Sequence, residues 1–349
     1  MTVPNPAAAI SIGHLTDLEA RGAAREITGG ISKAGRLWED TGLSVRYWLE
    51  RQMTASVVRR VAAQAGHPSA QAKGVSGMRE MAKKWRGAFV HPRIDNEPLP
   101  HVVDSQTAAF WVHRTSNKPG IALYVPATSF IIAPSEMQLK AMRAFAQAQD
   151  INIAVLQPPL APEHPFPEAI DMVANAVERV ADRLQISPKE IVLCGASSGA
   201  CLALSAALKL RDERDITTAG LMLFSPWVDL TLSGWSYVTR GLSRQSPFRL
   251  EFVAFCAKLY LGETPPSAPL ASPLFADLKD LPPILIHASR RDIYFDDAVR
   301  LVARALEDNV PAEVNYWNSQ RHFLEQFDCP DAARSFDLAG EFICRCLES

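Results

Sequence analysis

The sequence lacks several features that would place it in whole classes of proteins. In its 349 residues, Lys and Arg total 36 against 38 for Asp and Glu, so it has no broad positive field of the kind that binds nucleic acid. No apolar run approaches the roughly 20 residues that span a bilayer, and the first residues lack the basic segment and apolar run of a signal peptide. These absences predict a cytoplasmic protein with no integral membrane segment and no nucleic-acid partner.

Motifs for binding metals and nucleotides are also missing. The chain has neither a His-Glu-x-x-His motif nor a phosphate-binding glycine loop, so we expect no metal and no organic cofactor. Its six cysteines show no Cys-x-x-Cys pair and no Cys/His ligand spacing. They lie mostly in apolar segments, which favours buried free thiols; a redox pair of Cys344 and Cys346 is the alternative.

The residues that are present indicate an α/β fold. Hydrophobic residues make up 48% and charged residues 21% of the chain, close to the average for soluble globular proteins. From about residue 100, short β-branched runs alternate with longer helical patterns, which predicts a mostly parallel central sheet with helices on both faces. The expected strands are 109–113, 121–125, 151–156, 190–195, 220–225, 283–288 and 312–317. The expected helices are 135–148, 168–184, 198–210, 296–308 and 332–346.

Two segments fall outside this alternation. Residues 1–98 show mainly helical periodicity and are separated from the core, 99–349, by a proline-containing stretch. Between Val45 and Val61, apolar side chains share one helix face, a pattern typical of a helix that lies on a membrane surface or covers a groove in its own protein. An insertion at about 232–262 is rich in aromatic residues. We expect the two segments to roof an apolar pocket.

The sharpest local signal is the run Gly195-Ala196-Ser197-Ser198-Gly199, which follows a predicted strand and precedes a predicted helix. A tight strand-to-helix turn needs small residues on either side of its central residue, and it presents that residue at the carboxyl edge of the sheet. Ser197 is therefore a candidate nucleophile. A tight loop of small residues around an inert serine is the alternative interpretation.

A serine hydroxyl needs a base to take its proton, and the base needs an acid to fix its tautomer. In this kind of fold the order along the chain is Ser, then Asp or Glu, then His. Asp292 follows the predicted strand 283–288, and His322 follows the predicted strand 312–317 after a short loop. Asp296 and Asp297 are alternative acids, but they open a helical pattern, where Asp is more often a cap.

These segments together resemble the hormone-sensitive-lipase-like branch of the α/β-hydrolases. The resemblance extends over about residues 100–349 and includes several motifs in order: LAPEHPFPEAID at 160–171, GASSGA at 195–200, FSPWVDLT at 224–231, ASPLFADLKDLPPILIHAS at 271–289 and the DxxxDD pattern at 292–297. It implies an α/β-hydrolase fold, a serine esterase activity and a helical cap. It also implies Ser197 as nucleophile, Asp292 as acid and His322 as base.

The sequence departs from this family at the turn that binds the developing oxyanion. A His-Gly-Gly-Gly turn is usual after the third strand, whereas this chain has Pro126, Ala127, Thr128 and Ser129. Glycine permits positive φ and close approach of a substrate, so the loop must take another path or hold strained residues. The hydroxyls of Thr128 and Ser129, with the backbone N–H of Ser198, are candidate replacement donors.

Three functions are compatible with these residues. The first is hydrolysis of a carboxylic ester, thioester or lactone of a small apolar substrate by a serine nucleophile. The second is a non-hydrolytic step on a biosynthetic intermediate, such as elimination, cyclisation, retro-aldol cleavage or acyl transfer, which the lost glycine turn favours. The third is binding of a small apolar ligand without turnover. Expected pocket walls are Phe130, Trp227, Trp235 and Phe252, and the oligomeric state stays open, a homodimer being one option.

Overall fold

The computed structural model describes most of the chain from residue 102 to residue 348. The described residues are 75–76, 102–104, 109–115, 120–241, 250–319, 321–327 and 329–348. The chain divides into two units, Met1–Thr54 and Ala55–Ser349, and every described residue belongs to the second. The predicted amphipathic helix at 45–61 and nearly all of the predicted segment 1–98 lie outside the described residues.

An eight-stranded sheet forms the centre of the described part, with the order β1-β2-β4-β3-β5-β6-β7-β8. β2 runs antiparallel to both of its neighbours, and from β4 to β8 all neighbouring strands are parallel. The strands are β1 (Val102–Asp104), β2 (Ala109–His113), β3 (Ile121–Val125), β4 (Ile153–Leu156), β5 (Ile191–Ala196), β6 (Gly220–Phe224), β7 (Ile284–Ser289) and β8 (Ala312–Trp317).

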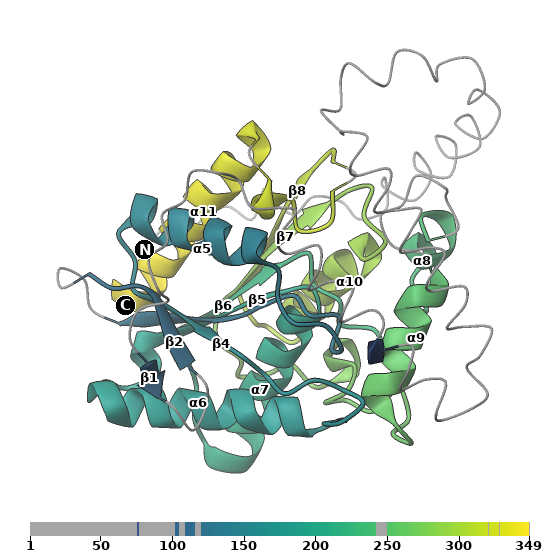
Figure 1. The fold of residues 1–349 in the computed structure, drawn as a ribbon, viewed down its shortest axis with the longest axis horizontal. Helices are drawn as coiled ribbons and strands as arrows, with labels where there is room; N and C mark the ends of the chain where they lie inside the picture. The colour runs from purple at the N-terminus through teal and green to yellow at the C-terminus, as the bar shows by residue number, and fades with distance from the viewer. Residues whose placement is uncertain are drawn as a thin grey trace, which may run out of the picture. The chain divides into compact units, whose positions relative to one another are not determined.

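Helices cover both faces of this sheet (Figure 1). They are α5 (Glu136–Gln149), α6 (Glu168–Leu184), α7 (Ser198–Arg214), α8 (Trp235–Thr239), α9 (Leu250–Leu261), α10 (Phe295–Glu307) and α11 (Pro330–Glu348). No helix among the described residues is both long and apolar enough to cross a lipid bilayer.

Alternating residues of the buried strands face the two helical layers, because successive side chains of a strand point to opposite faces of the sheet. Leu123 and Leu193 pack in a cluster with residues of α6, α7 and α10. Tyr124 and Cys194, one position further along the same strands, pack with residues of α5 and α11. The central strands are buried on both faces, which explains their nearly continuous apolar sequence.

The predicted elements agree closely with the observed ones. Three strands, 109–113, 121–125 and 312–317, and the helix 168–184 have the predicted bounds, and the other predicted elements differ by up to four residues at an end. The sequence did not predict β1, because a three-residue strand is too short to show an alternating pattern. The aromatic segment 232–262 contains α8 and α9, with residues 242–249 between them outside the described part.

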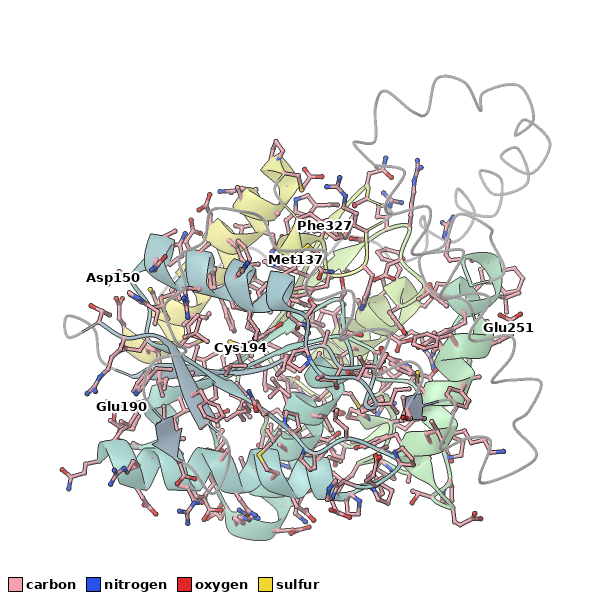
Figure 2. All side chains as sticks on the ribbon, viewed as in Figure 1. Met137, Asp150, Glu190, Cys194, Glu251 and Phe327 are labelled. Carbon is pink, nitrogen blue, oxygen red and sulfur yellow. The ribbon has the colours of Figure 1, made fainter. Side chains whose placement is uncertain are left out.

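The parallel strands all end at one edge of the sheet, and the candidate residues lie in the loops that follow them. Figure 2 labels Asp150, at the end of α5, and Glu190, directly before β5; both lie at the edge where the parallel strands begin. The opposite edge receives the carboxyl ends of β3, β5, β6, β7 and β8. In open α/β sheets, binding sites form at that edge.

Candidate active site

Ser197 occupies a strained turn between β5 and α7. Its backbone has φ 54° and ψ −120°, a combination that non-glycine residues rarely adopt. The turn is held by its neighbours: the Ser197 N–H donates to the carbonyl of Phe224 at the end of β6 (2.9 Å), and the Ser197 carbonyl accepts from the N–H of Ala200 (3.0 Å). Ser197 is 3% exposed. The surrounding structure therefore determines where its hydroxyl can point.

The two glycines of the motif are required by close backbone approaches. A Cβ at Gly195 would lie 2.4 Å from the carbonyl oxygen of Gly199, and a Cβ at Gly199 would lie 2.1 Å from the carbonyl oxygen of Val125. Neither contact can be relieved by moving a flexible side chain, because the opposing atoms belong to the backbone. The start of α7 thus packs directly against the end of β3, which brings the Ser197 turn beside the loop that follows β3.

His322 and Asp292 are joined by a short hydrogen bond. Asp292 follows β7 and His322 follows β8, and the distance between His322 Nδ1 and Asp292 Oδ2 is 2.7 Å. Both side chains are buried, with 7% and 1% exposure. Since a carboxylate only accepts hydrogen bonds, Nδ1 carries the hydrogen, and Nε2 of a neutral imidazole is left as the basic nitrogen.

A chain of hydrogen bonds connects the His322 loop to the Ser197 turn. The N–H of Phe323, the residue after His322, donates to the Ser225 hydroxyl (3.0 Å). Ser225 follows Phe224, whose carbonyl accepts from the Ser197 N–H. Sequence reasoning had not singled out Ser225, although it lies in the FSPW motif and has a positive φ of 43°.

A second series of contacts runs through aromatic rings. The backbone N–H of Trp227 donates to the Ser197 carbonyl at 3.3 Å. The Trp227 ring lies 5.3 Å from the ring of Tyr294, which lies 4.9 Å from the imidazole of His322. Two independent series of contacts therefore bring Ser197 and the His322–Asp292 pair to the same edge of the sheet.

Asp296 and Asp297 hold other parts of the structure together. Asp297 is fully buried, and its Oδ2 accepts from the Tyr237 hydroxyl (2.8 Å) and from two backbone N–H groups of the loop after β6. Burial raises the pKa of Asp297 well above its usual range. Asp296 Oδ2 accepts from the N–H of Ser236 at the start of α8 (2.9 Å). Both carboxyls thus fasten α8 to α10, while the carboxylate bonded to His322 is that of Asp292.

The loop after β3 keeps a glycine-like backbone without glycine. Ser129 and Phe130 have φ values of 47° and 64°, the left-handed region that costs non-glycine residues free energy. Side chains hold the loop there: the Thr128 N–H donates to the Ser198 hydroxyl (3.0 Å), and the Phe130 N–H donates to the Thr128 hydroxyl (3.2 Å). The missing glycines are therefore compensated by hydrogen bonds between this loop and the start of α7.

Some hydrogen-bond donors of the loop after β3 and the start of α7 have no acceptor among the described residues. The Thr128 and Ser198 hydroxyl oxygens lie 3.3 Å apart, so one of the two hydroxyls donates to the other. The remaining hydroxyl hydrogen has no acceptor within the described part of the chain, and neither do the backbone N–H groups of Ser129 and Ser198. Both Thr128 and Ser198 are buried. Three donors beside Ser197 are thus left for another group.

The four predicted pocket walls lie in two environments. Phe130 and Trp227 are buried in an aromatic cluster, where the Phe130 ring stacks on Tyr260 at 4.0 Å and lies 5.2 Å from Trp227. Phe252 in α9 is also buried, whereas Trp235 in α8 is 71% exposed. Contact of any of these side chains with a substrate stays a prediction.

Sequence reasoning also missed a buried polar group one turn after His322. Glu325 lies in a short 3₁₀ helix, η4 (Leu324–Gln326), and accepts a hydrogen bond from Ser335 of α11. The spacing His-x-x-Glu was visible in the sequence, but nothing there distinguishes a buried glutamate from a solvated one. Among the described residues, no cluster of three or more His, Cys, Asp or Glu side chains is arranged to hold a metal ion.

Comparison with known proteins agrees with this geometry. A family model described as alpha/beta hydrolase fold matches residues 122–325. An esterase from Acinetobacter venetianus is 30% identical over 227 residues, which are 64% of this chain and 74% of that protein. An acetyl-hydrolase from Streptomyces hygroscopicus is 30% identical over 237 residues, which are 67% of this chain and 79% of that protein.

Solved structures extend the comparison to three dimensions. The structure of an esterase from the bacterial hormone-sensitive lipase family matches with a TM-score of 0.70 and 27% identity, over 84% of this chain and 97% of its own. An esterase/lipase from an uncultured bacterium matches with a TM-score of 0.65 and 26% identity, over 77% of this chain and 98% of its own. By fold and by sequence, the chain belongs to the hormone-sensitive-lipase-like branch of the α/β-hydrolase fold family.

Proposed function

We propose that this chain hydrolyses a carboxylic ester, thioester or lactone of a small apolar substrate, with Ser197 as nucleophile, His322 as base and Asp292 as the acid that orients it. Ester hydrolysis itself follows from membership of a family whose similar proteins include an esterase and an acetyl-hydrolase. The chain is a carboxylic ester hydrolase. The observation that supports the assignment of residues is the buried His322–Asp292 hydrogen bond, on a loop bonded to the neighbours of Ser197.

In the first half of the reaction, Ser197 Oγ attacks the carbonyl carbon while its proton passes to His322 Nε2. The imidazolium is stabilised by the Asp292 carboxylate at Nδ1. When the tetrahedral intermediate collapses, the bond to the leaving group breaks and His322 returns the proton to the departing oxygen or sulfur. In the second half, water gives a proton to His322 and attacks the acyl carbon on Ser197; when this second intermediate collapses, the bond to Ser197 Oγ breaks, His322 returns the proton to Oγ, and the acid is released.

The oxyanion of the tetrahedral intermediate needs donors fixed in advance. We assign this role to the backbone N–H groups of Ser129 and Ser198, together with the spare hydroxyl hydrogen of the Thr128–Ser198 pair. The Thr128 N–H is not available, because it donates to the Ser198 hydroxyl. In this assignment a side-chain hydroxyl replaces a donor that a glycine turn would supply from the backbone. The Ser129 hydroxyl is a further candidate donor, since Ser129 is only half-buried.

One observation favours a second candidate, a non-hydrolytic reaction of the same three residues. The engagement of the Thr128 N–H reduces the number of backbone donors that face an attacked carbonyl. A hydroxyl pair in that place also suits a substrate group that must be held by both a donor and an acceptor. Elimination, cyclisation, retro-aldol cleavage and acyl transfer each have steps of this kind.

Covalent labelling and ester turnover test both candidates. We expect a fluorophosphonate to label the wild-type protein and short-chain p-nitrophenyl esters to be hydrolysed, with both signals lost in Ser197→Ala. Ser187→Ala, at an exposed serine before β5, is the matched control and keeps both signals. Ester turnover that is unchanged in Ser197→Ala contradicts the hydrolase assignment. Labelling without turnover supports the second candidate, and neither signal in a folded protein supports simple ligand binding.

A further inference from the structure

Glu325 is a buried carboxyl in the turn that follows the proposed base, His322. It lies in η4, three positions after His322, and is 2% exposed. Its Oε1 accepts from the Ser335 hydroxyl of α11 at 2.6 Å. Its ion-pair contact among the described residues is with His287, whose Nδ1 lies 3.9 Å from Glu325 Oε1. A carboxyl in such a place is costly to bury unless it is hydrogen-bonded or lies near an opposite charge.

His287 extends this contact into the sheet. It lies in β7 and is fully buried, with its Nδ1 2.7 Å from the Ser335 hydroxyl. Because Ser335 donates its only hydroxyl hydrogen to Glu325, it must accept from His287, so Nδ1 carries the hydrogen. Burial lowers the pKa of His287 to about 3, which keeps the imidazole neutral. The result is a series of donors, His287 to Ser335 to Glu325, directed at the carboxyl.

The charges around Glu325 connect it to the proposed active site. Burial raises the pKa of Glu325 to about 7, against the opposing effects of the Ser335 hydrogen bond and of positive charge on His322. Negative charge on Asp292 raises it further. The buried Tyr124 hydroxyl of β3 donates to Gln138 Oε1 of α5 (3.0 Å), and the pKa of Tyr124 is raised by burial and by the charge of Glu325.

The other elements that pack against η4 contribute no partner charge. α11 presents Ser335, and β7 presents the neutral His287. α5 carries Lys140 and Arg143, neither of which pairs with Glu325. The charge of His322 is therefore the one described positive charge that favours ionisation of Glu325.

We propose that Glu325 is a positioning residue for His322: its carboxyl, held through Ser335 and His287, fixes the turn behind the imidazole and, when ionised, stabilises the imidazolium formed during catalysis. This inference rests on the proposed function, because it needs His322 to gain a proton in the reaction. Asp292 acts on the imidazole by direct contact. Glu325 acts from the buried side through electrostatic interaction, which is strong where water is excluded.

The sign of the effect follows from elementary electrostatics. A nearby negative charge favours the protonated form of an imidazole. Replacing Glu325 by glutamine removes the charge but keeps the shape and an oxygen that can accept from Ser335. The imidazole then loses its proton more readily, so the basic form of the enzyme persists to lower pH, while the imidazolium of the transition state is less stabilised.

The test is the pH profile of ester hydrolysis by Glu325→Gln. We expect the acid limb of kcat/KM to move to lower pH by at least half a pH unit, and kcat to fall about three- to tenfold with little change in KM. Glu341→Gln, an identical exchange at an exposed position of α11, is the matched control and leaves the profile unchanged. A folded Glu325→Gln protein with the wild-type profile and kcat overturns the proposal.

A second variant and a second readout separate this inference from the proposed function. Ser335→Ala removes the donor that helps Glu325 to ionise, so we expect the same direction of change with a smaller size. In addition, the His322 imidazole can be titrated by NMR in the Ser197→Ala background, with and without Glu325→Gln. A lower titration midpoint in the double variant supports the inference even if esters are not the substrate, and equal midpoints contradict it whatever the substrate is.

Discussion

The two sides of Ser197 differ in how they are built. On the side of β7 and β8, the proposed base His322 and the proposed acid Asp292 are joined by one short hydrogen bond, and the Tyr294 ring lies 4.9 Å from the imidazole. On the side of β3, a loop without glycine is held by hydroxyls, and one of its backbone donors bonds to the Ser198 side chain. In the proposed mechanism, proton transfer thus depends on one direct contact between His322 and Asp292, whereas oxyanion stabilisation depends on the hydroxyl groups that hold the loop after β3.

This difference shows which requirement of the chemistry is stricter. A base must reach one nucleophile and one acid at once, so its position has little freedom. An oxyanion accepts hydrogen bonds from any donors that converge on it, whether they come from the backbone or from hydroxyls. We therefore expect substitutions on the β7–β8 side to abolish activity, and substitutions on the β3 side to reduce it only in part.

The largest effect is expected on the β7–β8 side. Asp292→Asn keeps the shape of the side chain but gives His322 the wrong tautomer and removes the charge beside the imidazolium. We expect kcat to fall by about 10⁴-fold, as for the corresponding exchange in a serine protease, measured with a short-chain p-nitrophenyl ester. Asp296→Asn, four positions later in the first turn of α10, is the control and keeps most of the activity. An Asp292→Asn protein that retains a tenth of the wild-type rate contradicts the claim that the β7–β8 side is the stricter requirement.

A smaller effect is expected on the β3 side. Thr128→Val removes one hydroxyl with little change in shape, and we expect kcat to fall about 10- to 100-fold while fluorophosphonate labelling of Ser197 persists. Thr218→Val is the matched control, because the Thr218 hydroxyl is buried, lies at the other edge of the sheet and has no partner among the described residues.

The pairing of Thr128 with Ser198 can be tested in the same assay. If the two hydroxyls act as a pair, the double variant Thr128→Val/Ser198→Ala loses less activity than the product of the two single losses. Multiplicative losses show that the two hydroxyls act independently rather than as a pair, and a Thr128→Val protein with the wild-type kcat shows that the Thr128 hydroxyl contributes no donor to the oxyanion.

The smallest expected effect is on stability. It measures the free energy that burial of Glu325, on the β7–β8 side of Ser197, costs the folded protein. The pKa of Glu325 rises from an ordinary 4.5 to about 7 through burial, so the folded state holds this proton more tightly than the unfolded state. Its contribution to stability is fully present below pH 4.5 and is lost as the pH rises to about 7. Glu325→Gln does not lose stability in this way, because glutamine does not titrate.

We therefore expect the free energy of unfolding of Glu325→Gln, relative to wild type, to increase by about 3 kcal/mol between pH 4.5 and pH 7.5, measured by urea denaturation at each pH. The buried His287 is common to both proteins, so its own titration largely cancels in the difference. A difference that stays constant with pH contradicts the raised pKa of Glu325 and the role derived from it.

Much of the fold could be predicted because local sequence patterns correspond to local structure. The β-branched runs and helical periodicities located strands and helices closely, and α6 was predicted with its observed bounds. The strand β1 was missed because its three residues are too short to show a pattern. The turn at Ser197 was predicted for the right physical reason, since Gly195 and Gly199 lie against backbone atoms that leave no room for a side chain.

The candidate site was predictable in part. Residue order and position at strand ends selected Ser197, Asp292 and His322, but they left Asp296 and Asp297 as alternative acids until the contacts of α8 were known. For the loop after β3, the sequence showed only what was missing. It could not show that the Thr128 N–H bonds to a hydroxyl 70 positions away.

The amino-acid sequence by itself determined the order of the secondary structure, the family and the residue types available for catalysis, because these depend on periodicity and on short motifs. Only the tertiary structure decided which of those residues meet. The hydroxyl pair of Thr128 and Ser198 and the donor series from His287 through Ser335 to Glu325 each join segments that are distant in the chain. Hydrogen bonds are directional and act over about 3 Å, so they form where folding has placed the atoms, and no local pattern of residues encodes that placement.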